Sequence, residues 1–82
     1  MKRTIPRTVH LPGGYVITVR RLNDASANEE MGAEVYAMWD VDDKIITLRS
    51  ARSKQKLRED WCHELAHAMV DYYDWFIGKA DK

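Results

Sequence analysis

Two kinds of apolar spacing divide the chain. Between Tyr15 and Arg49, β-branched and aromatic residues form short runs that are bounded by turn residues, whereas from Ser53 onward apolar residues recur every three or four positions. The first pattern is typical of β-strands and the second of an amphipathic α-helix. The sequence therefore predicts an α+β fold in which a small sheet packs on one long C-terminal helix.

Three runs are predicted to be strands, and the first follows the turn residues of 11–14. They are residues 15–20, 34–40 and 44–49. Because only Val41, Asp42 and Asp43 separate the second run from the third, we expect these two to form an antiparallel hairpin. Segment 23–32 is rich in Asn, Asp, Ser and Gly, and it is interpreted as a loop with room for a short turn of helix. These runs predict a small antiparallel sheet of about three strands.

The C-terminal part predicts one long helix. Ser53 is a suitable N-cap, and Gly78 with Lys79 would stop the helix. Cys62 lies at the edge of the apolar stripe and is interpreted as a small buried hydrophobe. On a helix the apolar residues share a stripe about 120° wide that would pack against the sheet; they are Leu57, Trp61, Leu65, Ala68, Met69, Tyr72 and Phe76.

Composition limits the class of protein. Eighty-two residues predict one domain, 1–82, whose core is small enough to benefit from a metal or a partner chain. The lone cysteine suits a reducing compartment, and no apolar run is long enough for a signal peptide or a membrane span, so we expect a cytoplasmic protein. Thirteen basic residues balance thirteen acidic ones, which makes nucleic acid a weak candidate partner.

Candidate chemistry is concentrated at His63, Glu64 and His67 on the predicted helix. Histidines four residues apart rise on one helical face and can converge on a single tetrahedral ion, for which Zn²⁺ is the first choice. Both point nearly opposite to the apolar stripe. Glu64 lies beside that face, where it can act as general base on a metal-coordinated water. The alternative is a pair of surface histidines on a polar helical face.

The run from His63 to Tyr72 resembles the active-site helix of the gluzincin branch of the HExxH zincin metallopeptidases. Its wider context, residues 34–75, is similar to the small ImmA/IrrE-like and SprT-like zincins common in phages and mobile elements. The resemblance implies a zinc-dependent metallopeptidase that acts on a peptide or protein substrate. It also implies that the strand at 44–49 would be the sheet edge, where an extended peptide could add as another strand.

The third metal ligand is not assigned by this pattern. Gluzincins take their third ligand from a following helix, and metzincins take theirs from a position that comes after a glycine. Neither feature is found at the corresponding place after His67. Asp71 and Asp74 project from the same face as the histidines, but Asp71 lies about 12 Å of helical rise from His63. A role for Asp71 in orienting His67 or holding nearby backbone is therefore favoured over ligation. His10 is a further candidate. Without a third ligand the site would be weak, completed by another subunit, or lost.

Two classes of function remain open on these grounds. The first is a zinc metallopeptidase with Glu64 as general base, for which Glu64→Gln would abolish hydrolysis while metal stays bound. The second is a non-catalytic interaction or regulatory module on a zincin scaffold, with a structural or degenerate metal site. A nucleic-acid-associated protein has only the basic segments in its favour and would need steeply salt-dependent binding to support it.

Overall fold

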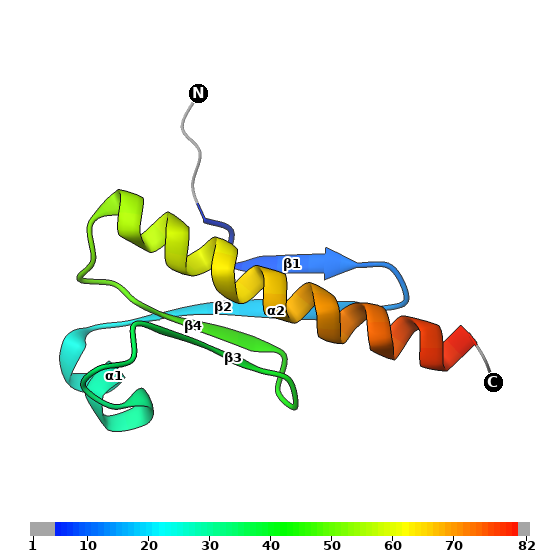
Figure 1. The fold of residues 1–82 in the computed structure, drawn as a ribbon, viewed down its shortest axis with the longest axis horizontal. Coiled ribbons are helices and arrows are strands. Elements are labelled where there is room, and N and C mark those ends of the chain that lie inside the picture. The colour runs from blue at the N-terminus through cyan, green and yellow to red at the C-terminus, as the bar shows by residue number, and fades with distance from the viewer. Residues whose placement is uncertain (1–4, 81–82) are drawn as a thin grey trace.

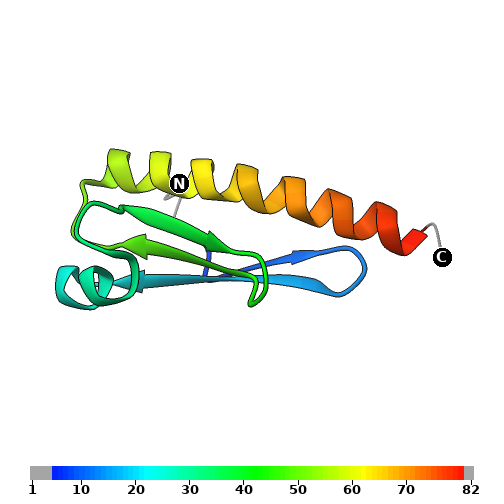
Figure 2. The same cartoon turned by 60° about the horizontal axis from the view of Figure 1, so that its bottom comes forward.

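A computed structural model describes residues 5–80, and part of the N-terminal basic segment, residues 1–4, lies outside the described residues. One four-stranded sheet carries a long helix across one of its faces (Figures 1 and 2). In chain order the elements are β1 (Thr8–Leu11), β2 (Tyr15–Leu22), α1 (Asp24–Met31), β3 (Ala37–Asp40), β4 (Ile45–Arg49) and α2 (Lys54–Ala80). The α+β class and the long C-terminal helix are as predicted.

The sheet is mixed and has the order β1-β2-β4-β3. β1 and β3 pair antiparallel with their neighbours, but β2 and β4 run parallel, with Thr18 opposite Ile45. The prediction of three antiparallel strands is therefore wrong in number and in direction. The expectation that residues 44–49 form the sheet edge is also wrong, because β4 lies in the interior. The free edges in the described chain belong to β1 and β3.

Both hairpins are closed by turn residues suited to them. Between β1 and β2, Gly13 and Gly14 have φ angles of 86° and 79°, which side chains rarely tolerate. Between β3 and β4, the Asp40 carboxylate accepts hydrogen bonds from the backbone N–H groups of Asp42 and Asp43 at 3.0 and 3.1 Å. The predicted antiparallel pairing of the second and third runs is confirmed by this second hairpin.

The segment predicted to be a loop with room for a short turn of helix forms helix α1, which has eight residues. Asn23 caps its N-terminus by accepting a hydrogen bond from the Ser26 N–H at 2.9 Å, and Gly32 ends it with a φ of 101°. The buried Arg49 side chain holds this helix against the sheet. Its guanidinium donates to the Asp24 carboxylate at 3.1 Å, the Asn28 amide at 2.9 Å and the carbonyls that follow α1. α1 therefore depends on β4 for its position.

Helix α2 begins as predicted, because the Ser53 hydroxyl accepts from the Lys56 N–H at 3.2 Å. It does not stop at Gly78 but continues to Ala80. No helix within residues 5–80 is long and apolar enough to cross a membrane. The core lies between α2 and the sheet, and its buried members are Tyr15, Ile17, Val19, Ile46, Leu48, Leu57 and Ala68.

The face that α2 turns to the sheet is rotated relative to the predicted stripe. Trp75 packs against the core, whereas Met69 and Phe76 remain 38% and 42% exposed. Cys62 is exposed as well, so its prediction as a buried hydrophobe is wrong. The same rotation half-buries Asp71 on the side of α2 that contacts β3. The sheet covers fewer apolar residues of α2 than their spacing suggested.

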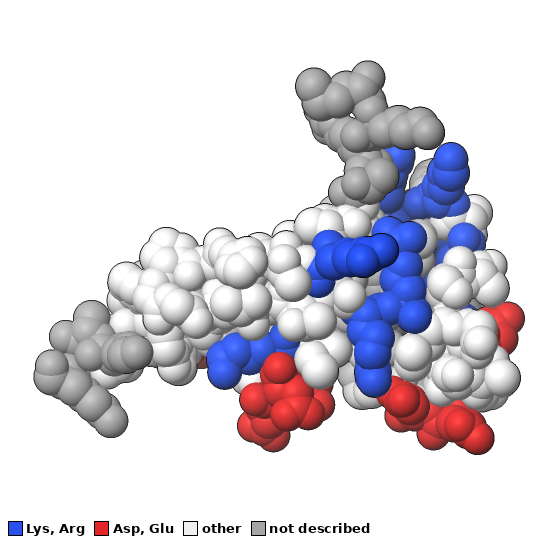
Figure 3. All heavy atoms as spheres, turned by 180° about the vertical axis from the view of Figure 1, so that it is seen from behind, with Lys and Arg blue, Asp and Glu red and all other residues white. Residues whose placement is uncertain are grey.

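Basic side chains gather over the part of the surface seen from behind in Figure 3, and acidic side chains border them. One such pairing is direct: the Arg20 guanidinium lies 2.6 Å from the Glu30 carboxylate and 3.1 Å from the Thr47 hydroxyl. The positive charge of Arg20 is therefore partly neutralised by the protein itself.

Candidate metal centre

His63 and His67 lie one turn apart on the solvent-facing side of α2. Both are exposed, and their rings meet edge to face with centroids 4.8 Å apart. The two Nε2 atoms are separated by 3.1 Å, a hydrogen-bonding distance when one neutral ring donates its N–H to the other. The structure thus brings together the two residues that the sequence predicts as ligands.

The Nε2 separation also suits a shared metal ion. Two imidazole nitrogens on a tetrahedral zinc, each about 2.0–2.1 Å from the ion, lie about 3.3–3.4 Å apart. The observed 3.1 Å is within a few tenths of an ångström of that value. His63 and His67 therefore fit a chelated metal on an accessible face of the helix.

Glu64 projects from the adjacent side of α2 and is partly buried. Seven residues separate it from Asp71, so the two carboxylates lie along the same side of the helix, two turns apart. Asp71 contacts β3, which places Glu64 on the side of α2 that faces this edge strand. Its carboxylate has no hydrogen bond or ion pair with another residue of the described chain. It is available to a ligand or a water molecule.

Asp71 is held by Trp39 of β3. The indole Nε1–H donates to Asp71 Oδ2 at 2.6 Å, a short bond as expected for a charged acceptor. Burial raises the pKa of the neighbouring Tyr15 hydroxyl, and the negative charge of Asp71 raises it further. Asp71 therefore connects α2 to the sheet edge through a side chain, whereas the predicted roles were to orient His67 or to hold nearby backbone. Sequence spacing could not reveal Trp39 as its partner, because the two residues meet only in the tertiary fold.

In the part of the chain that the structure describes, no third ligand joins the two histidines. Within residues 5–80, no group of three or more His, Cys, Asp or Glu side chains is placed to hold a metal ion. His10 lies on β1, where its Nε2 is 3.4 Å from the Thr8 hydroxyl. Asp74 is exposed on α2, one turn beyond Val70. The described residues bring together two candidate ligands and a nearby carboxylate, whereas a catalytic zinc site has three protein ligands.

Comparison with known proteins adds no relative. No protein-family model matches the chain, and no curated protein or solved structure is significantly similar to it. The functional argument therefore rests on the geometry of this site.

Proposed function

We propose that the chain is a zinc-dependent peptidase in which His63 and His67 bind the metal and Glu64 is the general base. The observation that carries the proposal is the 3.1 Å Nε2–Nε2 separation on an exposed helical face. When bound, zinc supplies Lewis acidity that makes water nucleophilic near neutral pH. The chain's own residues contribute the chelate, the base and a surface for the substrate.

Glu64 is suited to the transfer of protons because its carboxylate lacks a partner in the described chain. It can accept a proton from the attacking water and pass it to the leaving amine. The free edge of β3 lies on the same side of α2 as Glu64. An extended substrate could therefore pair with β3 as an added strand. This assigns to β3 the docking role that sequence reasoning gave to residues 44–49.

The test combines metal binding with peptide hydrolysis. Purified protein is dialysed against zinc, and bound zinc is measured by elemental analysis for the wild type, His63→Ala, His67→Ala and Glu64→Gln. We expect both alanine variants to lose the metal. Glu64→Gln should keep it while hydrolysis of a fluorogenic peptide library falls by at least about 100-fold, the lower range for loss of general-base catalysis. Hydrolysis that survives in Glu64→Gln would refute the mechanism.

A second candidate function is a non-catalytic module whose metal stabilises the fold. It is favoured by the lack of a third ligand among the described residues. In that case zinc would bind and raise the melting temperature, chelation would lower it, and no peptide would be cleaved. A wild type that binds no zinc would exclude the peptidase and would favour an interaction module whose metal site is degenerate.

A further inference from the structure

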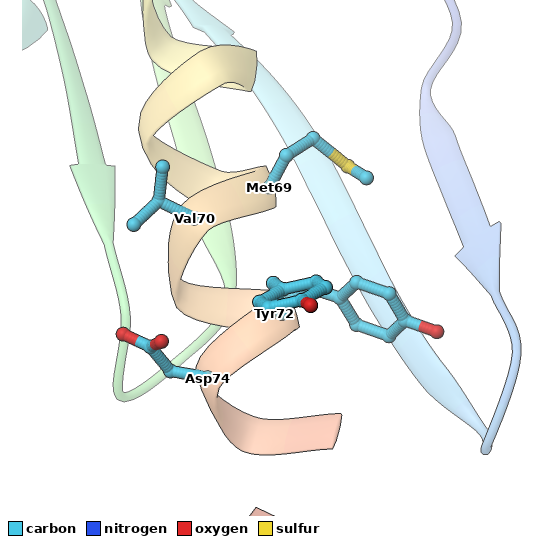
Figure 4. Close-up of a pocket in the computed structure, with 5 residues that line it drawn as sticks. Met69, Val70, Tyr72 and Asp74 are labelled. Atoms are coloured by element: carbon cyan, nitrogen blue, oxygen red, sulfur yellow. The ribbon is translucent and has the colours of Figure 1, made fainter. Parts of the chain in front are cut away.

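The side of α2 that faces away from the sheet carries an unusual amount of apolar surface. Val70 and Tyr73 are 63% and 64% exposed, and Ile77 is 42% exposed. Figure 4 shows that Val70 and Asp74 project to one side of the helix and Met69 to the other. An open hollow in this region is lined by Met69, Val70, Tyr72, Tyr73 and Asp74. Exposed apolar area of this kind marks a contact surface.

The spacing of the exposed apolar residues indicates which kind of secondary structure would pack on this surface. Ala66, Val70, Tyr73 and Ile77, together called the outer seam, follow His63 in steps of three, four, three and four. These steps average 3.5 residues, the repeat with which one helix presents a straight stripe to another helix. The core stripe on the opposite side is already used by the sheet. The occupant of the outer seam is therefore expected to be a helix.

The outer seam is complementary to itself when two copies run antiparallel. With Val70 opposite Tyr73 of the second copy, Ala66 falls opposite Ile77, so each layer pairs a smaller residue with a larger one. The flanking positions agree with this alignment. On one flank Met69 meets Phe76 of the other copy, and both are exposed apolar side chains.

The other flank of the same alignment is polar. His67 there meets Asp74 of the second copy, which gives an attractive pairing of imidazole with carboxylate at each end of the two-fold interface. In this arrangement the Asp74 carboxylate of the second copy lies beside the two histidines, for which the described residues provide no third ligand. A site of two histidines and one carboxylate matches the ligand set of catalytic zinc and leaves the fourth position open to water.

From these observations we infer that a second copy of this chain docks antiparallel on the outer seam and supplies Asp74 as the third ligand to His63 and His67. The inference rests on the proposed function for the metal, but the docking itself rests on the apolar seam. It would explain why no third ligand joins the two histidines within the described residues of one chain. It also assigns Asp74 to the metal of the other subunit, because on its own helix Asp74 lies seven residues beyond His67.

The first experiment is sedimentation equilibrium of the full chain with and without zinc. We expect a dimer for the wild type and a monomer for Val70→Glu, which places a charge in the seam and leaves the proposed ligands intact. Met38→Glu is the control, because Met38 is also an exposed apolar side chain, at 39%, but lies on β3 away from the seam. It should remain dimeric. A wild type that stays monomeric with zinc at about 100 µM would overturn the inference.

Orientation and ligation are tested separately. In a Cys62→Ser background, a mixture of Val70→Cys and Tyr73→Cys proteins should form a mixed disulfide, whereas Val70→Cys alone should not cross-link. Cross-linking of Val70→Cys alone would overturn the antiparallel pairing. Zinc should tighten the wild-type dimer at least about tenfold by linkage, and Asp74→Ala should abolish that tightening while still dimerising without zinc. An unchanged zinc effect in Asp74→Ala would overturn the ligand assignment.

These results separate the inference from the function on which it rests. A zinc-binding monomer that cleaves peptides supports the peptidase and overturns the dimer. A cross-linked antiparallel dimer that binds no zinc supports the docking and overturns both the metal function and the role of Asp74. A zinc-dependent dimer without hydrolysis supports the inference and points to the non-catalytic module.

Discussion

The hydrogen bond between Trp39 and Asp71 allows a test of two roles for the Asp71 carboxylate. One role is a metal ligand, and the other is a structural link between α2 and β3. Its 2.6 Å length and its partly buried setting indicate a charge-assisted bond, for which the net contribution is about 1.5–3 kcal/mol. We therefore expect Asp71→Ala to lower the free energy of unfolding by about 2 kcal/mol. For a chain of this size, that loss corresponds to a decrease of roughly 8–16 °C in melting temperature.

A double-mutant cycle isolates the bond from the other effects of each substitution. Urea unfolding at pH 7 is followed by circular dichroism for the wild type, Trp39→Phe, Asp71→Ala and the double variant. Because Trp39→Phe also removes apolar area, only the coupling energy reports the bond, and we expect about 1.5–3 kcal/mol. Glu29→Gln is the control for loss of an exposed carboxylate on α1 and should change stability by less than about 0.5 kcal/mol.

Zinc stoichiometry of the same proteins completes the test. If Asp71 is a structural link, we expect folded Asp71→Ala to keep the zinc that we propose to bind at His63 and His67. A coupling energy below about 0.5 kcal/mol, together with loss of zinc in Asp71→Ala, would refute the structural role and make Asp71 a ligand.

Three further predictions concern stability. Arg49→Lys should destabilise the fold by about 2–4 kcal/mol in urea unfolding, because an ammonium cannot replace the several bonds of the buried guanidinium. Gly13→Ala should cost more than Gly14→Ala by at least about 0.5 kcal/mol: both have positive φ, but an added Cβ meets Trp75 at 3.2 Å only at Gly13. Because burial raises the pKa of Tyr15 above its ordinary value of 10.0, its stabilising contribution is present below pH 10 and is lost as the pH rises through the folded-state pKa. Tyr15→Phe should therefore reduce the alkaline loss of unfolding free energy measured between pH 8 and pH 11, and an unchanged slope would contradict this.

Local patterns predicted the parts of the fold that depend on neighbouring residues. The period of α2, its N-cap at Ser53 and the β3–β4 hairpin all follow from residues close in sequence. The parallel pairing of β2 with β4 does not, because it joins segments more than twenty residues apart through a connection that contains α1 and β3. No periodicity within either strand specifies its neighbour or its direction.

Two of the errors had signals in the sequence. The Gly13-Gly14 turn lies between two β-prone segments, so it also implied a strand before it, at Thr8–Leu11. The helix α1 is preceded by the N-cap residue Asn23 and followed by Gly32, a boundary pattern that the polar composition of the segment obscured. In both cases the turn and cap residues carried more information than the average hydropathy.

The candidate site shows the same division between local and tertiary information. Helical spacing places His63 and His67 on one face, so the closeness of their imidazoles, 3.1 Å between the Nε2 atoms, was predictable. The partners of the nearby carboxylates were not predictable. Asp71 projects from nearly the same side of the helix as the histidines, but Trp39 of β3 engages it across the fold. That engagement favours a structural role for Asp71, and a single helix cannot bring Asp74 back to His63. Within the described residues no third side chain joins the two histidines, so we propose that Asp74 of a second copy reaches them across the exposed outer seam.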